Sequence, residues 1–366
     1  MCTRAQVHLQ RMGVLEDILA AKQGRWASVG GFVSPSGIRV IGTSAQHMPT
    51  PVVIAIKRLV LDEKIARAAV RAGATLVEEA PVARAVFAAA QGIWTIHCRP
   101  KHPQEYQARV LVAADGASSA LARSLGVVTT FPEAVCSRAY VTAGTSSFDM
   151  DGLVFYPPTL LPGYCALLRE AGDEINFCCY IMPGGQCTPT DLRTMHNTLL
   201  HTDTHVRQAL GPEVRLERMK GAALRLGGVP CSYADHLLVV GDAAGHIDPL
   251  TGEGIQYGMD AAAIAAETLA EAFAAHDWRA SMLKCYQERW MRAFGWDFVW
   301  SQRMAAWYTR HPIFLDACAV VTQRRGTEFL DEWAQVMTGT RPKSAFLRSS
   351  LMFPLLGEVV RQWWRR

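Results

Sequence analysis

The sequence predicts an α/β protein in which a Rossmann-like, doubly wound parallel sheet is interleaved with a mostly antiparallel β lobe and followed by a helical region. Three observations lead to this fold class. Short apolar runs end in an Asp-Gly pair at residues 115–116 and a Gly-Asp pair at 241–242, as buried parallel strands do. Residues 26–56 and 131–226 show the short-strand and turn pattern of an antiparallel β lobe. From residue 255 onward the pattern is helical.

Composition limits the classes of protein and partner. Of the 366 residues, 50% are apolar and 19% are charged, which suits a globular chain with two lobes. The formal net charge of +4 is too small to indicate a nucleic-acid partner. The ten cysteines are scattered without a C-x-x-C pair, so we expect a cytoplasmic protein with neither a disulfide framework nor a metal site. No run of 18 apolar residues is present, so no membrane-spanning helix is predicted.

The first third of the chain alternates between helical and strand patterns. Residues 4–19 carry Val, Leu, Met and Ile on one helical face, with a break at Gly13. Residues 59–72 form a second amphipathic pattern. We then expect, in order, a short strand at 74–78, a hairpin at 82–98 and a buried strand at 108–116.

The remaining elements divide the chain into interleaved lobes. One helix is expected within the β lobe, at residues 190–210, and residues 237–240 fit a buried parallel strand before a long helix that begins near Ile255. The predicted domains are a discontinuous Rossmann-like lobe at residues 1–24, 57–126 and 227–276, a second lobe at 25–56 and 127–226, and a helical C-terminal region at 277–366.

The segment VVGDAAGHIDPLTGEGIQYGMD, residues 239–260, carries the strongest functional signal. Gly252 and Gly254 would let the backbone approach a flat ligand, and the helix that begins at Ile255 directs its positive end to the same place. An electron-rich, partly anionic ligand suits such a place. Gly-Asp turns and glycine helix starts are also common structural features, so this segment alone does not establish a site.

Three stretches taken together resemble a flavoprotein superfamily. They are IKRLVLDEKIARAAVRAGATLVEE, VLVAADGASSALARSLGV and the segment at 239–260, in this order along the chain. The chain resembles the aromatic-ring hydroxylases and, more closely, the geranylgeranyl reductases, over nearly its whole length. The resemblance implies an FAD-dependent oxidoreductase with an FAD-binding Rossmann-like lobe, a substrate lobe, and NAD(P)H as a transient reductant.

The resemblance also implies roles for residues of the segment at 239–260. Asp242 would accept a hydrogen bond from a ribityl hydroxyl of FAD. Gly254 and Ile255 would offer backbone N–H groups to the carbonyl edge of the flavin at N1–C2, where negative charge collects upon reduction. Gly252 would complete the glycine pair that admits the flavin ring.

Three further residues are expected to contact FAD by their positions in the resemblance. Arg58 falls where the family has an arginine near the phosphates and ribityl chain of FAD, and Val82 matches a backbone contact to the adenine side. Asp115 would organise a region shared between the cofactor and the pyrophosphate of the reductant. The alternative for Arg58 is a surface ion pair, since Asp62 lies four residues further on.

The expected substrate motif is only partly kept. Pro162, Gly163 and Tyr164 match it, which makes Tyr164 the substrate-binding candidate through packing and one hydrogen bond. Ala166 stands where Trp is usual, and Arg169 would place a charge in a pocket wall. Because an unpaired buried charge is costly, we expect a pocket that is not shaped for a long prenyl chain.

Three functions remain open on the sequence. In the first, a geranylgeranyl reductase-like enzyme passes hydride from reduced flavin to a C=C bond of a hydrophobic substrate. In the second, a flavin-dependent monooxygenase hydroxylates an aromatic or polyketide-like substrate. In the third, the chain is a truncated, non-catalytic fragment with weak FAD binding. No catalytic residue can be named from the sequence.

The glycine fingerprint of dinucleotide-binding folds is missing. No G-x-G-x-x-G follows an N-terminal strand, so we expect the FAD-binding lobe to be truncated at its N-terminus and to hold FAD poorly. The strands that end at Asp115 and Gly241 are then expected to lack their middle neighbour and to expose unpaired edges.

Histidine and tryptophan patterns receive simpler interpretations. His201 and His205 lie one helical turn apart without a third ligand, which favours surface histidines over a metal site. Eight of the ten tryptophans lie from Trp278 onward, and most are expected in the core. The end of the chain, EVVRQWWRR, is both aromatic and basic, so peripheral membrane contact is an alternative for this segment.

Overall fold

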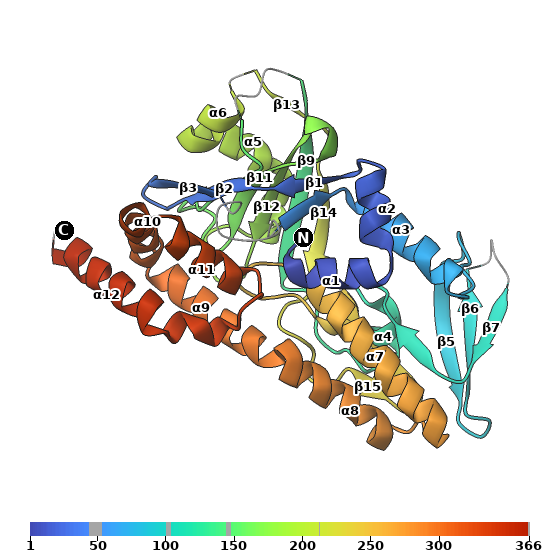
Figure 1. The fold of residues 1–366 in the computed structure, drawn as a ribbon. Coiled ribbons are helices and arrows are strands. Elements are labelled where there is room, and N and C mark those ends of the chain that lie inside the picture. Colours follow the sequence, from blue (N-terminus) through green and yellow to red (C-terminus); the bar gives the residue numbers. More distant parts are fainter. Residues whose placement is uncertain (44–52, 100–103, 144–147, 212, 365–366) are drawn as a thin grey trace. The chain divides into compact units, whose positions relative to one another are not determined.

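The protein forms two compact units, shown in a computed structural model that describes residues 1–43, 53–99, 104–143, 148–211 and 213–364 (Figure 1). Unit 1 comprises Met1–Ile65, Ala134–Ala222 and Trp300–Arg366, and unit 2 comprises Ala66–Glu133 and Ala223–Val299. Residues 1–24, predicted for the Rossmann-like lobe, group with the β lobe in unit 1. The assignment of the predicted lobes to cofactor and substrate stays a prediction.

Unit 1 contains most of the strands and the C-terminal helices. Its elements are α1 (Thr3–Arg11), α2 (Val14–Ala20), β1 (Gly24–Ala27), β2 (Val29–Val33), β3 (Arg39–Thr43), β4 (Val53–Ile56), β9 (Ala134–Ala143), β10 (Gly152–Phe155), β11 (Tyr164–Arg169), β12 (Ile175–Ile181), α5 (Leu192–Thr202), α6 (Thr204–Leu210), β13 (Arg215–Leu216), α10 (Ile313–Arg325), α11 (Thr327–Met337) and α12 (Ser349–Trp364).

Unit 2 contains the strands that lead to the Asp-Gly and Gly-Asp pairs. Its elements are β5 (Val82–Ala88), β6 (Ile93–Cys98), β7 (Glu105–Ala108), β8 (Leu111–Ala113), α4 (Ala120–Ser124), β15 (Tyr233–Ala234), β16 (Leu237–Val239), the 3-10 turn η4 (Gly241–Ala244), α7 (Ile255–Ala275), α8 (Ala280–Trp290) and the π-helical turn η5 (Met291–Gly295). Three elements cross the boundary between the units: α3 (Arg58–Arg71), β14 (Lys220–Leu224) and α9 (Trp296–Arg310).

One large sheet organises unit 1. Its strand order is β13-β9-β12-β11-β10-β2-β3, with β14 also on β9, and its pairs from β13 to β3 are antiparallel except for the parallel pair of β10 and β2. Phe155, Leu167 and Phe177 bury their side chains in a core to which Leu199 of α5 also belongs. The predicted mostly antiparallel β lobe is therefore confirmed.

A short parallel pair organises unit 2. β16 lies beside β8 in parallel register, with Leu237 opposite Leu111 and Val239 opposite Ala113, and β15 pairs with the other side of β16. No strand lies between β8 and β16, but their direct pairing leaves no unpaired edge between them, so that part of the expectation is wrong. The remaining edge of β8 has no strand partner among the residues that the structure describes. β5, β6 and β7 form a separate antiparallel sheet.

Most elements with a clear sequence period form as predicted. Helices α1 and α2 are separated at Gly13, whose φ of +68° is the left-handed conformation that glycine tolerates. The hairpin at 82–98 is β5 and β6, and α7 begins at Ile255. The predicted helix at 190–210 is split by Asp203, whose carboxylate caps α6 by accepting hydrogen bonds from the N–H groups of His205 and Val206.

Two predicted strands differ from the structure. Residues 74–78 form no strand, and Leu76 and Val77 are each 43% exposed. A β-prone run needs a neighbouring strand for its hydrogen bonds, and no described strand pairs with this one. The strand predicted at 108–116 is only Leu111–Ala113, in which Val112 is exposed and Ala113 on the opposite face of the sheet is buried.

The expectation that most of the late tryptophans are core residues is wrong. Trp290 and Trp333 are buried, whereas four of the eight are exposed. The exposed ones are Trp296, Trp307, Trp363 and Trp364. Helical spacing indicates a common face, but it does not say whether another element covers that face.

Candidate functional site: the Gly-Asp turn and the start of α7

The Gly-Asp turn follows β16 directly, beside the end of β8. The N–H of Val240 donates to the carbonyl of Ala113 at 3.0 Å, which continues the parallel pairing by one residue. The chain then turns at Gly241, whose φ is +66°, and enters η4. The N–H of His246 donates to the carbonyl of Gly241 at 3.1 Å and closes the turn. The Asp-Gly and Gly-Asp motifs therefore follow neighbouring strands.

His246 holds the turn from the inside. Its side chain is fully buried, and its Nδ1 accepts a hydrogen bond from the N–H of Gly241 at 3.2 Å. The ring centroids of Trp290 and Phe294 lie 4.8 and 5.4 Å from that of His246. Burial in this aromatic environment lowers the pKa of His246 to about 3. His246 is therefore neutral near pH 7, which keeps Nδ1 an acceptor.

A second turn, organised by Asp248, leads from the Gly-Asp turn to α7. Asp248 is fully buried, and its Oδ1 accepts hydrogen bonds from the N–H groups of Leu250 at 2.8 Å and Thr251 at 3.1 Å. Its backbone N–H donates to the carbonyl of Glu253 at 2.9 Å, and its carbonyl accepts from the N–H of Gly252. Gly252 has a φ of +70°, so this predicted residue serves the turn geometry.

Gly254 lies against Asp242, so two predicted cofactor residues are brought together. A Cβ atom at Gly254 would be 3.3 Å from Asp242 Oδ1 and 2.9 Å from Ile247 Cγ1, closer than normal packing allows. One turn further along α7, a Cβ atom at Gly258 would meet only the Cα of Gly241, at 3.8 Å. These small residues let the first turn of α7 pack closely on the Gly-Asp turn.

The start of α7 lies beside the Asp242 carboxylate. α7 begins at Ile255, and its N-cap residue Gly254 has no side chain that could accept from the first N–H groups. The aligned peptide dipoles of this long helix add partial positive charge at the same end. A carboxylate acceptor and several N–H donors therefore lie within one helical turn. This combination fits a ligand that carries hydroxyl groups and carbonyl oxygens, as the ribityl and flavin parts of FAD do.

Arg225 packs against the Gly-Asp turn, although no sequence pattern pointed to it. It is 1% exposed; its Nη1 donates to the carbonyl and hydroxyl oxygens of Thr130 at 2.5 and 2.6 Å, and its Nη2 donates to the carbonyl of Ala117 at 3.0 Å. Burial lowers the pKa of Arg225. A Cβ atom at Gly245 would be 3.2 Å from Arg225 Cγ. Arg225 thus ties the loop after the Asp-Gly pair to the Gly-Asp turn.

Sequence reasoning also missed His246 and Asp248. Both lie inside the quoted segment at 239–260, where the glycines drew attention instead. A polar residue within an otherwise apolar and glycine-rich stretch was the available signal, because a buried polar side chain needs a structural partner.

Asp115 and Val82 have clear structural positions in unit 2. The Asp115 carboxylate accepts a hydrogen bond from the N–H of Leu121 at 2.9 Å and one from the hydroxyl of Ser119 at 3.2 Å, so it stabilises the start of α4. Val82 is the first residue of β5 and is 44% exposed. Their contacts to a nucleotide stay predictions.

Arg58, in unit 1, forms the ion pair that was the alternative for it. Its Nε and Nη2 donate to the two carboxylate oxygens of Asp62 at 3.0 and 3.2 Å, and both side chains are exposed. An exposed pair of this kind contributes little stability, so Arg58 remains available to a ligand. Its contact to FAD stays a prediction.

Tyr164 belongs to an aromatic cluster of unit 1. Its ring centroid lies 6.1 Å from that of Tyr156 and 5.4 Å from that of Tyr180. The chain at Gly163 lies so close to the backbone of Tyr180 that only glycine fits, since a Cβ atom there would be 2.1 Å from the carbonyl oxygen of Tyr180. Substrate binding by Tyr164 stays a prediction.

Arg169, expected to place a charge in a pocket wall, has partners for that charge, and the expectation of a pocket not shaped for a prenyl chain stays a prediction. Arg169 lies at the other end of β11 from Tyr164, where its Nε donates to the carbonyl of Met150 at 3.3 Å. Its Nη1 lies 3.6 Å from the carboxylate of Asp173. Because the charge is paired, Arg169 gives no argument against a prenyl chain.

The pH dependence of stability tests the neutral state of His246. The pKa of this residue falls from 6.5 to about 3 on folding, so below about pH 6.5 the unfolded chain binds a proton that the folded chain does not. The folded state then loses up to about 1.4 kcal/mol per pH unit as the pH falls. The variant His246→Asn keeps an acceptor oxygen without this titration, so its stability should change less between pH 7.5 and 5.5.

Urea unfolding at both pH values measures this difference. We expect wild type to lose about 1 kcal/mol or more relative to His246→Asn over this range. The control is His276→Asn, since His276 is exposed and asparagine suits its left-handed φ of +51°. Identical pH profiles for wild type and His246→Asn would contradict the burial of a neutral histidine.

Relatives of the chain include a receptor and several reductases. No protein-family model matches the chain. It is 48% identical over 376 residues to conditioned medium factor receptor 1 of Dictyostelium discoideum, covering 100% of this chain and 74% of that protein. It is 30% identical over 249 residues to digeranylgeranylglycerophospholipid reductase 2 of Methanopyrus kandleri, covering 67% of this chain and 63% of that protein.

Solved structures share the fold. A geranylgeranyl bacteriochlorophyll reductase-like protein from Thermoplasma acidophilum has a TM-score of 0.70 at 18% identity, covering 81% of this chain and 75% of that chain. A flavin-dependent brominase has a TM-score of 0.66 at 18% identity, covering 93% of this chain and 83% of that chain. The chain is similar in sequence to a digeranylgeranylglycerophospholipid reductase and shares its fold with flavin-dependent enzymes, and it belongs to the family of conditioned medium factor receptor 1.

Proposed function

We propose that the chain is an FAD-dependent oxidoreductase of the geranylgeranyl reductase type, which reduces a C=C bond of a hydrophobic substrate. The observation that carries this proposal is the packing of Gly254, at the start of α7, against the Asp242 carboxylate. Similarity to a digeranylgeranylglycerophospholipid reductase supports the reaction type. FAD, when bound, supplies hydride chemistry, and NAD(P)H is the proposed electron donor.

In this proposal, residues of the Gly-Asp turn and of the start of α7 bind the ligand and orient it. The Asp242 carboxylate accepts a hydrogen bond from a ligand hydroxyl. This hydrogen bond is stronger than one between two neutral groups, because the acceptor is charged. The N–H groups of Gly254 and Ile255 donate to a carbonyl oxygen and stabilise negative charge that develops there. His246 and Asp248 keep these groups in place without contacting the ligand.

The aromatic cluster of unit 1 is the proposed substrate side. Tyr156 and Tyr164 are partly exposed and pack against the buried rings of Phe32 and Tyr180, so they offer aromatic surface that carries phenol groups. Burial raises the pKa of Tyr156, so its phenol stays protonated at neutral pH and acts as a hydrogen-bond donor. A surface of this kind suits a hydrophobic substrate with few polar groups.

We also propose that α12 rests on an anionic membrane surface, which would give access to such substrates. Large apolar side chains repeat along one face of this helix and remain exposed, at the C-terminal end of the chain (red in Figure 1). They are Phe353, Leu356, Val360, Trp363 and Trp364, with exposed fractions of 71%, 46%, 53%, 70% and 78%. An exposed apolar face with aromatic residues is typical of helices that lie in a membrane interface.

The charges of α12 favour anionic lipids as the partner. Glu358, the single carboxylate of the helix, is 2% exposed and pairs with Arg324 and Arg361. The exposed charge of α12 is therefore basic, and two further arginines follow it in the sequence. Within the described parts of the chain, every helix is too short or too polar to cross a bilayer.

Two other functions are distinguished from this proposal by experiment. A monooxygenase would share the fold but consume oxygen with NADPH. A receptor is favoured by the name of the Dictyostelium relative, and it would bind its ligand without turnover.

Loss of the Asp242 carboxylate should weaken FAD binding about tenfold or more, because a charge-assisted hydrogen bond contributes about 1.5–3 kcal/mol. Isothermal titration of Asp242→Ala with FAD measures this change. Glu288→Ala is the control, since it removes an exposed carboxylate that pairs with Lys284 on the surface of α8. Unchanged affinity in Asp242→Ala would remove Asp242 from the site, and equal loss in both variants would indicate a general charge effect.

Turnover assays test the reaction itself. We expect the FAD-loaded protein to reduce a prenylated lipid under anaerobic conditions with NADPH, which product mass detects as two added hydrogens per C=C bond. Oxygen-dependent hydroxylation of an aromatic substrate would support the monooxygenase instead. Stoichiometric FAD without turnover would support the receptor, and failure to bind FAD would overturn all flavin-dependent functions.

The double variant Trp363→Ser/Trp364→Ser should bind anionic vesicles about tenfold or more weakly than wild type, because it removes two large apolar contacts. Co-sedimentation with phosphatidylserine vesicles and with neutral phosphatidylcholine vesicles measures this change. Trp296→Ser is the control, because Trp296 is 64% exposed but belongs to α9. Absence of vesicle binding in wild type, or a dimer that the double variant abolishes, would overturn the membrane proposal.

A further inference from the structure

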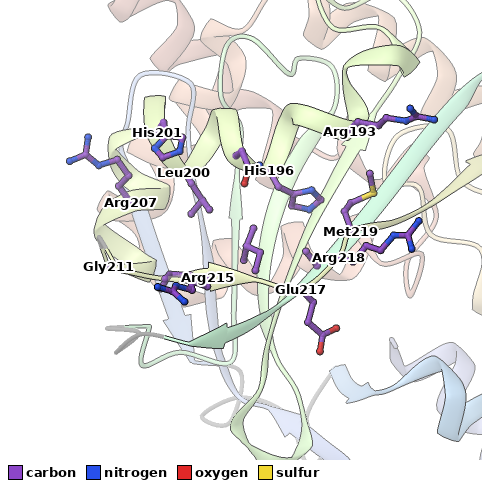
Figure 2. Close-up of a pocket in the computed structure, with 14 residues that line it drawn as sticks. Arg193, His196, Leu200, His201, Arg207, Gly211, Arg215, Glu217, Arg218 and Met219 are labelled. Carbon is purple, nitrogen blue, oxygen red and sulfur yellow. The ribbon is translucent and has the colours of Figure 1, made fainter.

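A cavity of about 760 Å³ lies in unit 1, between the helices α5 and α6 and the β9–β13 edge of the large sheet (Figure 2). None of the residues proposed for FAD or for the hydrophobic substrate lines it. Its volume is in the range of sites that enclose a small molecule. The cavity is therefore a second candidate site, independent of the proposed flavin chemistry.

Four arginines dominate the lining of this cavity. Figure 2 shows Arg207 and Arg215 toward one end and Arg193 and Arg218 toward the other. Glu217 is the only carboxylate among the lining residues, so three positive charges are in excess. Within the described chain, none of the four guanidinium groups forms a hydrogen bond or ion pair. All four arginines are exposed, and an anion bound beside either pair would offset the excess of positive charge there.

His196 adds a buried acceptor to the same cavity. It is 3% exposed, and its Nε2 lies 3.0 Å from the carbonyl oxygen of Phe177, which can only accept. Nε2 therefore carries the proton, and Nδ1 is a bare acceptor. Nδ1 is buried without a hydrogen-bond partner among the described residues. Burial lowers the pKa of His196, which keeps the ring neutral. A ligand with one acidic O–H group, such as the monoanion of a phosphate ester, would satisfy this nitrogen by donating a hydrogen bond.

Apolar side chains complete the cavity and narrow the class of ligand. Leu200, Val214, Leu216 and Met219 line it together with the charged groups. Arginine forks match the oxygen geometry of phosphate and are its commonest side-chain partners in bidentate recognition. We propose that this cavity binds a phosphate monoester that carries an apolar group.

Isothermal titration with small probes tests this proposal. Hexyl phosphate carries both features, so it should bind about fivefold or more tightly than either inorganic phosphate or hexanol. Hexyltrimethylammonium, which has the same apolar group and the opposite charge, should not bind. Absence of hexyl phosphate binding, or equal binding of the cationic probe, would overturn the proposal.

Charge-matched variants locate the binding in the cavity. Arg215→Gln and Arg218→Gln should each weaken hexyl phosphate binding about fivefold or more, since each removes a charge-assisted contact. Arg84→Gln is the control, because Arg84 is an exposed arginine on β5 outside the cavity. Equal weakening in all three variants would show a general charge effect and would overturn the assignment to this cavity.

The nitrogen signals of His196 give a readout inside the folded protein. In NMR spectra of wild type, the Nδ1 resonance should shift on addition of hexyl phosphate, and the shift should be smaller in Arg215→Gln. Binding without any change at Nδ1 would place the ligand elsewhere. Phenyl phosphate and vesicles with lysophosphatidic acid distinguish a water-soluble source of the phosphate ester from a lipid source, since only the true source should compete with hexyl phosphate.

Discussion

The hydrogen bond between the Gly241 N–H and the buried Nδ1 of His246 is the constraint on which the Gly-Asp site depends. It fixes the turn after β16, and that turn presents the Asp242 carboxylate to the start of α7. The bond exists only while His246 is neutral, which its aromatic surroundings ensure by excluding water. A protonated ring would turn the acceptor into a donor facing another donor. The geometry of the site is therefore maintained by a residue that does not face the ligand.

The candidate sites of the two units differ in the kind of ligand that they suit. Unit 2 has a carboxylate next to a helix N-terminus, which suits a polar ligand with hydroxyl and carbonyl groups. Unit 1 has the arginine-lined cavity and the apolar face of α12, which suit an anionic group and a lipid environment. The cavity and α12 share no residue, so each is tested by its own experiment and neither bears on the flavin chemistry proposed for unit 2.

The relatives illustrate that one fold supports more than one role. The 48% identical protein of Dictyostelium is named as a receptor, whereas the archaeal relatives are named as reductases. A fold of this kind can bind a flavin and a second ligand whether or not hydride transfer follows. The distinction between these roles depends on particular side chains of the substrate side and on turnover, which the shared architecture does not specify.

Local patterns of the sequence determined the helices, the break at Gly13 and the packing of Gly254 against Asp242, because these features depend on residues close together in the chain. Tertiary structure decided what depends on distant partners. Residues 74–78 form no strand because none lies beside them, and β8 and β16 pair although more than 120 residues separate them. The neutral state of His246, the ties made by Arg225 and the exposure of Trp363 likewise follow from which elements surround each side chain, and no sequence period encodes that.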